Sequence, residues 1–359
     1  MAAHTAAVVG AGSQGRVHAR GYQTIADVTV TGLADINIET AAETAADLSI
    51  PRWYADYREL LDAERPDLLS ICTPPVEHLA VVRQAIDAGV RAIHCEKPIA
   101  TTYGDALEMH DLAAKAGVQL TFNLQRRYEA VHAFAREQIA AGTIGEIISI
   151  EGYCPNLPDW GTHVCDLILF YLGDVAPSWV FGQVDVSVNR YVYGAFAETS
   201  SLTHVQWPNG VNATVLTGRE PQTPTRNLQV NTGLIVHGAQ GRIEATGARC
   251  IVRRFDEPEL IHECPFNRDQ STWERGVDPS IVAGTAAAIQ DLVASLESGR
   301  EPRLASRHGL AGAEIIFATY ESSRTRSRVE LPLRITDNPL LTGLAEGFWQ
   351  PRGEQRSTY

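Results

Sequence analysis

The sequence predicts a two-domain protein, in which an α/β domain with a doubly wound parallel sheet precedes an α+β domain with a mostly antiparallel sheet. Three observations support this fold class. Strand and helix patterns alternate through the first third, polar and apolar residues alternate through much of 147–255, and 359 residues are too many for one compact core. We therefore expect domains at 1–123 and 124–359.

The first domain is predicted from short apolar strands that lead into amphipathic helices. Such alternation builds a parallel sheet with helices on both faces, and the carboxyl ends of its strands form the usual ligand-binding edge. In order, we expect a strand at 6–12, a helix at 15–25, strands at 28–36 and 67–75, a helix at 78–89, a strand at 91–98, a helix at 103–117 and a strand at 118–124.

The pattern changes after a predicted helix at 126–145, which ends in glycines. Alternating segments follow, and Asn209-Gly210 after Trp207-Pro208 is a hairpin signal between two of them. An antiparallel sheet is therefore expected, completed by two late helices. The clearest strand segments are 180–192, 203–216 and 232–247, and the helices are 280–299 and 308–324.

Composition excludes several classes of function. A net charge of -13 and a pI near 5.3 argue against a surface that binds nucleic acid or an anionic membrane. We see no apolar run long enough to cross a bilayer and no leader pattern at the amino terminus, so we expect a cytoplasmic protein. The six cysteines show no CxxC spacing, so reduced thiols are expected.

A glycine-rich turn, GAGSQG, lies between the first strand and the first helix. The first glycine allows a tight turn, the second lets the backbone approach a pyrophosphate, and the third lets the helix pack closely on the strand. The pyrophosphate would lie at the amino terminus of the helix. The predicted cofactor contacts here are Gly10, Gly12, Ser13, Gln14 and Gly15.

Asp35 closes the second predicted strand, where a carboxylate can accept hydrogen bonds from the adenosine ribose hydroxyls. The same carboxylate would repel a 2'-phosphate, and no arginine or lysine follows it before Arg52. The sequence therefore favours NAD over NADP.

Lys97 is unusual, because the chain contains 28 arginines and only two lysines. A lysine whose pKa is lowered by burial can exchange a proton near neutrality, whereas arginine cannot. Lys97 follows Glu96 at the carboxyl end of a predicted strand, and Thr73-Pro74 ends another. These residues would face the nicotinamide end of the cofactor, with His78 below it supporting the loop rather than reacting.

The second constellation is the segment DWGTHVCD. In a single helix, Asp159, His163 and Asp166 would fall at i, i+4 and i+7 on one face. An acid beside an imidazole can fix its tautomer and stabilise its charged form, which suits proton transfer. The cysteine and histidine spacing here fits no familiar zinc pattern, so we expect no metal.

Weaker substrate candidates flank these motifs. Two arginines follow the strand at 118–124 and could orient a hydroxyl-rich or anionic substrate, although a solvated helix start is an equal interpretation. Aromatic and amide side chains near DWGTH could contact a sugar ring or could simply pack in the core. These candidates are Arg126, Arg127, Tyr153, Asn156 and Trp160.

Taken together, GAGSQG, Asp35, CTPPVEH, CEKP and DWGTH resemble the family of glucose-fructose oxidoreductase and inositol dehydrogenase, over nearly the whole chain. The resemblance implies a Rossmann domain, a carboxyl-terminal domain with a large open sheet, NAD(P)-dependent redox at a sugar or cyclitol hydroxyl, and homodimers or homotetramers formed through that sheet. It also implies that Lys97, Asp159 and His163 act together in catalysis.

The function expected from these observations is NAD-dependent oxidation of a secondary hydroxyl of a sugar, sugar derivative or cyclitol. One alternative is an oxidoreductive glycosidase that oxidises transiently, eliminates a glycosidic substituent and reduces the product again. A second alternative is a non-catalytic NAD-sensing module. The presence of Lys97, Asp159 and His163 together argues against this alternative. The sequence leaves open the substrate, the reacting hydroxyl, and whether Lys97 or His163 is the proximal base.

Overall fold

The computed structural model describes residues 4–218, 233–246, 249–255, 257–263 and 279–353, and the chain divides into two compact units. The first unit contains Met1–Ala100, Asp105–Tyr128 and Asn267–Leu310, and the second contains Thr101–Gly104, Glu129–Phe266 and Ala311–Tyr359. The predicted division into 1–123 and 124–359 did not include the return of a late segment to the first unit.

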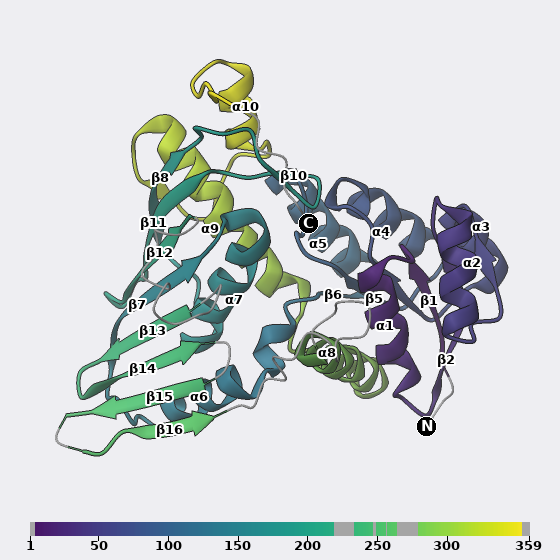
Figure 1. The fold of residues 1–359 in the computed structure, drawn as a ribbon, viewed down its shortest axis with the longest axis horizontal. Helices are drawn as coiled ribbons and strands as arrows, with labels where there is room; N and C mark the ends of the chain where they lie inside the picture. The colour runs from purple at the N-terminus through teal and green to yellow at the C-terminus, as the bar shows by residue number, and fades with distance from the viewer. Residues whose placement is uncertain (1–3, 219–232, 247–248, 256, 264–278, 354–359) are drawn as a thin grey trace. The chain divides into compact units, whose positions relative to one another are not determined.

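A six-stranded parallel sheet forms the centre of the first unit, in the order β3-β2-β1-β4-β5-β6 (Figure 1). Every position of β4 and β5 is buried, as expected for strands covered on both faces. This confirms the predicted doubly wound sheet. Its strands are β1 (His4–Val9), β2 (Val28–Ala34), β3 (Trp53–Tyr54), β4 (Leu68–Ile71), β5 (Ala92–Cys95) and β6 (Gln119–Phe122).

Helices cover this sheet, and α8 lies beside α1 (Figure 1). The two helices approach closely because residue 21 is glycine: a Cβ there would lie 2.8 Å from Ile289 Cδ1 and 3.3 Å from Ala286 Cα. The helices are α1 (Ser13–Gln23), α2 (Ile38–Asp47), α3 (Tyr57–Glu64), α4 (His78–Asp87), α5 (Tyr103–Ala116) and α8 (Pro279–Ser298).

By length and composition alone, α8 is apolar enough to cross a membrane, which the sequence analysis did not anticipate. A core helix of a soluble domain meets the same criteria. One face of α8 is buried, and its Thr285 lies 3.1 Å from the side-chain nitrogen of Asn123. Its length and composition are therefore weak evidence for a membrane span.

The second unit is built on a nine-stranded sheet in the order β16-β15-β14-β13-β7-β12-β11-β8-β17. Neighbouring strands are antiparallel except for β7 and β12, which confirms the mostly antiparallel prediction. The strands are β7 (Ile147–Cys154), β8 (Trp179–Asp185), β11 (Ser200–Gln206), β12 (Asn212–Thr217), β13 (Gly233–Gly238), β14 (Gly241–Thr246), β15 (Arg249–Arg254), β16 (Leu260–Glu263) and β17 (Val329–Glu330). A short hairpin, β9 (Tyr191–Val192) and β10 (Ala195–Phe196), follows β8.

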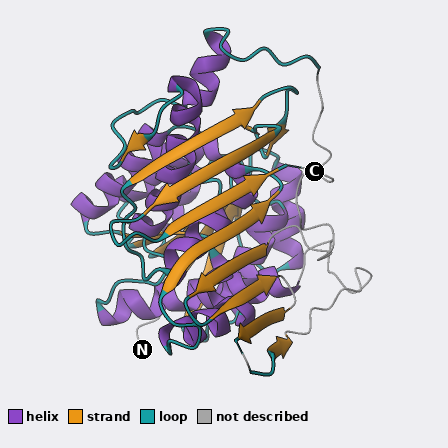
Figure 2. Cartoon of the chain, turned by 90° about the vertical axis from the view of Figure 1, so that its left-hand side faces the viewer, coloured by secondary structure: helices purple, strands orange, loops and turns teal. Residues whose placement is uncertain are grey.

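Helices of the same unit cover one face of this sheet, and Figure 2 shows the opposite face toward the viewer. Gly152 of β7 faces α7, because a Cβ there would lie 2.6 Å from Val164 Cγ1. Gly182 of β8 likewise faces Thr319 of α9 at 2.6 Å. The helices of this unit are α6 (Ala130–Ala140), α7 (Thr162–Tyr171), α9 (Ser306–Thr325), which begins in the first unit, and α10 (Pro339–Ala345).

Apolar residues alternate along 184–194, a pattern that would suit the exposed outer face of a sheet, but the structure does not place them there. Val184 and Val186 are buried, and β8 ends at Asp185. Phe181 and Leu202, on adjacent strands, are 44% and 41% exposed on the open face. Alternation identifies two faces of a strand, but it does not tell which of them the helices cover.

Candidate active site

The glycine turn after β1 shows three different requirements for glycine. Gly10 has φ +95°, and a Cβ on it would lie 2.5 Å from the carbonyl oxygen of Cys72. A Cβ on Gly15 would lie 1.8 Å from the carbonyl oxygen of Gly10, whereas a Cβ on Gly12 would meet no atom within 4 Å. The turn is therefore closely packed on the inside and open at Gly12, beside the first backbone N–H groups of α1.

Asp35 directly follows β2 and is tied to this turn. Its Oδ2 accepts a hydrogen bond of 2.8 Å from the backbone nitrogen of Ala11, and its Oδ1 accepts one of 2.9 Å from Asn37. Each carboxylate oxygen retains a further lone pair. The open turn and this fixed acid fit the pyrophosphate and ribose of a dinucleotide, with exposed Ser13 and half-buried Gln14 in the first turn of α1.

His78 supports the loop that ends β4. Its Nδ1 lies 2.9 Å from the carbonyl oxygen of Ile99, and its Nε2 lies 2.9 Å from that of Thr73. Burial lowers its pKa, against the effect of these two carbonyl groups. The imidazole thus links the Thr73-Pro74 loop to the segment that follows Lys97, as expected of a supporting residue.

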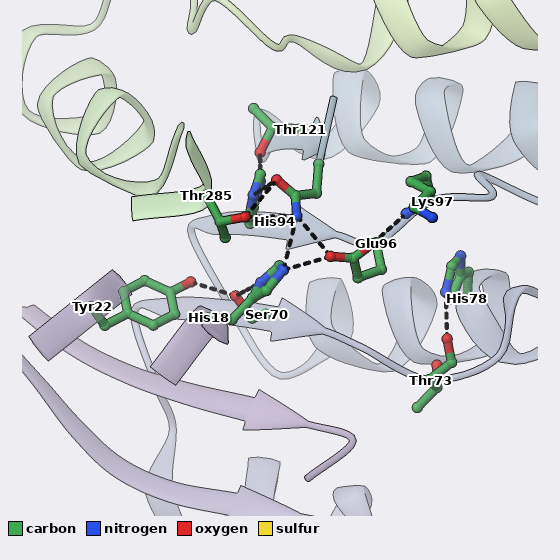
Figure 3. A network of polar contacts seen from close by, with 11 residues as sticks. His18, Tyr22, Ser70, Thr73, His78, His94, Glu96, Lys97, Thr121 and Thr285 are labelled. Carbon is green, nitrogen blue, oxygen red and sulfur yellow. Dashed lines mark hydrogen bonds and ion pairs between the residues drawn. The ribbon is translucent and has the colours of Figure 1, made fainter. Parts of the chain in front are cut away.

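Glu96 and Lys97 lie at the carboxyl end of β5, and Glu96 is the centre of a buried polar network (Figure 3). Glu96 is buried, with only 4% of its surface exposed. Its Oε1 lies 2.9 Å from His18 Nε2 and accepts from Asn123 Nδ2 at 2.7 Å. Its Oε2 accepts from the backbone nitrogen of half-buried Lys97 at 3.1 Å.

Two branches of hydrogen bonds extend this network from Glu96, away from Lys97 (Figure 3). On one side, His18 Nδ1 lies 2.9 Å from Ser70 Oγ, which lies 3.1 Å from the Tyr22 hydroxyl. On the other, His94 lies 3.2 Å from Asn123 Oδ1 and 2.8 Å from Thr121 Oγ1. The members, all buried, come from α1, β4, β5, β6, the residue after β6, and α8.

The network sets the charge of its members. Burial opposes ionisation of Glu96, but the hydrogen bonds from His18 and Asn123 and the positive charge of Lys97 outweigh it and lower its pKa to about 2. Burial, with the neighbouring His18, lowers the pKa of His94 to about 3. At neutral pH, Glu96 is therefore an anion and His94 is neutral.

In the second unit, the DWGTH segment begins with a π-helical turn, Leu157–Gly161, and continues as α7. Asn156 caps this turn by accepting a 2.9 Å hydrogen bond from the nitrogen of Asp159, whose carbonyl accepts one of 2.6 Å from Thr162. The prediction of one regular helix was therefore wrong at its start. Buried Asp159 and buried His163 nevertheless lie on consecutive segments of the same unit.

Glu198 was missed by the sequence analysis. Its buried carboxyl accepts from the nitrogen of Leu157 at 2.6 Å, from Thr217 at 2.9 Å and from the Tyr320 hydroxyl at 2.9 Å. Burial raises its pKa against these hydrogen bonds. It anchors the π-helical turn that carries Asp159, and no local pattern in the sequence indicated this because its partners are 19 to 122 residues away.

The weaker candidates occupy different places. Arg126 and Arg127 lie in the short helix Gln125–Tyr128 of the first unit, with Arg127 only 1% exposed. Half-buried Trp160 lies in the π-helical turn. Tyr153 donates to Glu151 on the face of β7 opposite to the one that Gly152 presents to α7, so the structure does not group it with Asp159.

The structure thus brings Gly10–Gly15, Asp35, Thr73-Pro74 and Glu96-Lys97 to one edge of one parallel sheet. The association of Lys97 with Asp159 and His163, which belong to the other unit, stays a prediction. Among the described residues, no group of three His, Cys, Asp or Glu side chains could hold a metal ion. The five cysteines of the described part are free thiols, and Cys264 lies outside it.

A doubly wound sheet with this glycine turn and an acid at the end of β2 is typical of a dinucleotide-binding domain. Residues 4–124 match the oxidoreductase family with an NAD-binding Rossmann fold, Gfo/Idh/MocA. The chain is therefore similar to this family over these residues, most of which lie in the first unit.

Several proteins to which the chain is similar are named as sugar dehydrogenases. The chain is 27% identical over 361 residues to D-apiose dehydrogenase of Paraburkholderia graminis, covering 95% of this chain and 93% of the relative. It is 30% identical over 189 residues to D-glucoside 3-dehydrogenase of Escherichia coli, covering 46% and 53% respectively. The fold matches a structure of levoglucosan dehydrogenase with NADH and levoglucosan, with a TM-score of 0.77, 20% identity and coverage of 92% and 100%.

Replacing Gly12 by alanine should weaken dinucleotide binding by about tenfold or more while leaving the folded protein stable, because the added methyl enters only the open space. Gly15→Ala should instead lower the free energy of unfolding by roughly 1–3 kcal/mol, because its Cβ meets backbone. Calorimetric titration and denaturant unfolding measure the two effects. Equal loss of stability in both variants would contradict the assignment of Gly12 to the ligand.

The stability of the protein should fall on acidification in two steps. The pKa of His94 is lowered on folding from 6.5 to about 3, so the unfolded chain binds its proton first and stability declines as the pH falls from about 6.5 toward 3. The pKa of Glu96 is lowered from 4.5 to about 2, so its contribution is present above pH 4.5 and is lost toward pH 2.

Urea unfolding between pH 3.5 and 7.5 measures this dependence. His94→Gln should reduce the slope above pH 4.5, and Glu96→Gln should reduce it below that pH while costing about 3 kcal/mol at pH 7. Unaltered slopes in both variants would refute the assigned charges.

Proposed function

We propose that the chain is an NAD-dependent dehydrogenase that oxidises a secondary hydroxyl of a sugar, sugar derivative or cyclitol. The observation that carries the proposal is the placement of Lys97 at the same sheet edge as the glycine turn and Asp35. The names of the relatives, which include dehydrogenases of D-apiose and of D-glucosides, support a carbohydrate substrate.

NAD is favoured over NADP by the charges near the adenosine ribose. The carboxylate of Asp35 would lie against a 2'-phosphate. Arg52, the first cation after it in the sequence, donates to Glu64 at 2.7 Å and is thus paired with a carboxylate. One relative is named as an NADP-dependent D-xylose 1-dehydrogenase, and the levoglucosan dehydrogenase structure holds NADH, so the local charges matter.

Bound NAD would supply the hydride acceptor. The residues of the chain would supply binding, orientation and proton transfer: the glycine turn and α1 hold the pyrophosphate, and Asp35 holds the ribose. Lys97 would receive the hydroxyl proton as the substrate is oxidised, in concert with His163, whose imidazole Asp159 would orient. The buried surroundings of Glu96 hold the backbone of Lys97 in place during this transfer.

A second candidate function uses the same site transiently. Oxidation of a glycoside hydroxyl acidifies the neighbouring C–H, which permits elimination of the glycosidic substituent and subsequent reduction. The similarity to a D-glucoside 3-dehydrogenase favours glycosides as substrates to test. A panel of sugars, cyclitols and glycosides, read for both NADH and released aglycone, separates the two: aglycone without accumulated NADH would favour the second.

NAD should bind more tightly than NADP by one to a few kcal/mol, because Asp35 repels the 2'-phosphate. Titration calorimetry with each dinucleotide measures the difference, and Asp35→Asn should narrow it. Stronger binding of NADP to the wild-type protein would exclude the role given to Asp35.

Lys97→Arg should retain positive charge and NAD binding but lose turnover by about 100-fold or more, because arginine cannot exchange the proton. Lys97→Ala should lose a similar factor. Steady-state rates on a confirmed substrate decide the matter. A Lys97→Arg variant with most of the wild-type rate would show that the lysine acts only through its charge.

We also propose a homodimer or homotetramer in which the open face of the nine-stranded sheet is covered. Phe181 and Leu202 are exposed there on adjacent strands, which favours a partner surface. Light scattering at micromolar concentration should give a multiple of the chain mass of 39.1 kDa, and Phe181→Glu should shift it toward the monomer. A monomeric wild-type protein would rule out this assembly.

A further inference from the structure

The hydrogen bonds around His18 can be oriented by counting protons. Ser70 has one hydroxyl proton, which goes either to the Tyr22 oxygen or to His18 Nδ1. If it goes to Tyr22, the phenol proton has no acceptor among the described residues, and Tyr22 is fully buried. If Tyr22 donates to Ser70 and Ser70 donates to His18, every proton is used. His18 Nδ1 is then an acceptor, and Nε2 carries the proton toward Glu96.

In the branch through His94 and Asn123, the hydrogen bonds are also donated toward Glu96. His94 is neutral, so the nitrogen that faces Asn123 Oδ1 at 3.2 Å donates. The other nitrogen accepts the Thr121 hydroxyl proton at 2.8 Å, and the Ile93 carbonyl oxygen at 3.2 Å is the more distant acceptor for that proton. The Asn123 amide then donates to Glu96 Oε1 at 2.7 Å and to Thr285 at 3.1 Å. The 3.3 Å approach of Asn123 Nδ2 to His18 Nε2 is a contact between two donors that share one acceptor, Glu96 Oε1.

Donors from His18, Asn123 and the Lys97 backbone therefore converge on the Glu96 carboxylate, and chains of hydrogen bonds with one direction strengthen one another. The other titratable groups that act on Glu96 do not neutralise it. Burial raises the pKa of the Cys72 and Cys95 thiols, so these two are uncharged, and burial lowers the pKa of His78. Lys97 then supplies the positive charge opposite Glu96 among these groups.

His18 connects the Glu96–Lys97 charge pair to the cofactor site. His18 lies on α1, whose amino terminus adjoins Gly12 of the cofactor turn, and it reaches Glu96 78 residues further along the chain. Asn123, next to β6, approaches the same oxygen. The residue before Lys97 is thus fixed to the helix of the cofactor site and to the neighbouring strand.

We propose that His18 is a positioning residue of the dehydrogenase reaction: as a neutral imidazole with its proton on Nε2, it holds the Glu96 carboxylate against Lys97 and couples the lysine to α1. The proposal rests on the function proposed above. It assigns His18 no contact with substrate or cofactor. Its effect should appear in kcat and in the pH profile more than in the affinity for NAD.

Two substitutions of His18 test the proposal. Glutamine has an amide nitrogen that can donate to Glu96 and an oxygen that can accept from Ser70, but it cannot carry a positive charge. His18→Gln should keep kcat within about threefold of the wild type, and His18→Leu should lower it by at least about tenfold through misplacement of Lys97. The KM for NAD should change by less than about threefold in both.

The matched control is His132, another buried histidine, which lies in the other unit and hydrogen-bonds the Tyr171 hydroxyl at 2.7 Å. His132→Gln should leave kcat and the pH profile unchanged. In His18→Leu, the pH profile of kcat should shift, whereas in His18→Gln it should stay. Wild-type kcat in folded His18→Leu would overturn the proposal, and an equal loss in His18→Gln and His18→Leu would show that an imidazolium is required.

The ring nitrogens of His18 give a test that needs neither substrate nor a folded leucine variant. In wild-type protein labelled with ¹⁵N-histidine, the signals absent from His18→Gln should show one protonated and one unprotonated nitrogen at pH 7. Two protonated nitrogens at pH 7 would overturn the neutral assignment. Absence of turnover by the wild type on every sugar and cyclitol would instead contradict the proposed function, while these spectra still decide the state of His18.

Discussion

The buried carboxylate of Glu96 is the constraint on which the candidate site depends. An anion at 4% exposure is tolerated only if donors surround it, and His18, Asn123 and the backbone of Lys97 provide them. Because these donors come from α1, the residue after β6 and the end of β5, the same requirement fixes three parts of the first unit against one another. The location of Lys97 at the sheet edge follows from where this carboxylate can be satisfied.

The parts of the site that repeat a local pattern could be predicted from the sequence. The glycine turn needs three glycines within six residues, and Asp35 needs only to follow the second strand, so both were found by spacing. The network beneath Lys97 could not be found in this way. His18 and Glu96 are 78 residues apart, and Asn123 and Glu96 are 27 apart, so their contact depends on the order of strands and on the register of α1 against the sheet.

The second unit shows where periodicity misleads. A regular helix was expected to begin at DWGTH, but a π-helical turn comes first, because Asn156 caps it and Glu198 binds the nitrogen of Leu157. Tyr153 lies close to this turn in sequence, yet its direction along β7 places it on the other face of the sheet. Sequence proximity therefore did not give the direction of individual side chains.

The central claim is that the first unit presents a dinucleotide to Lys97 across a sheet edge fixed by Glu96. A crystal structure of the protein with NAD and a substrate tests this most directly. The account predicts the pyrophosphate over Gly12, the ribose hydroxyls on Asp35, and the Lys97 amine in hydrogen-bond contact with the reacting hydroxyl beside the nicotinamide. A complex in which Lys97 points away from the reacting hydroxyl, with the Glu96 contacts intact, would contradict it.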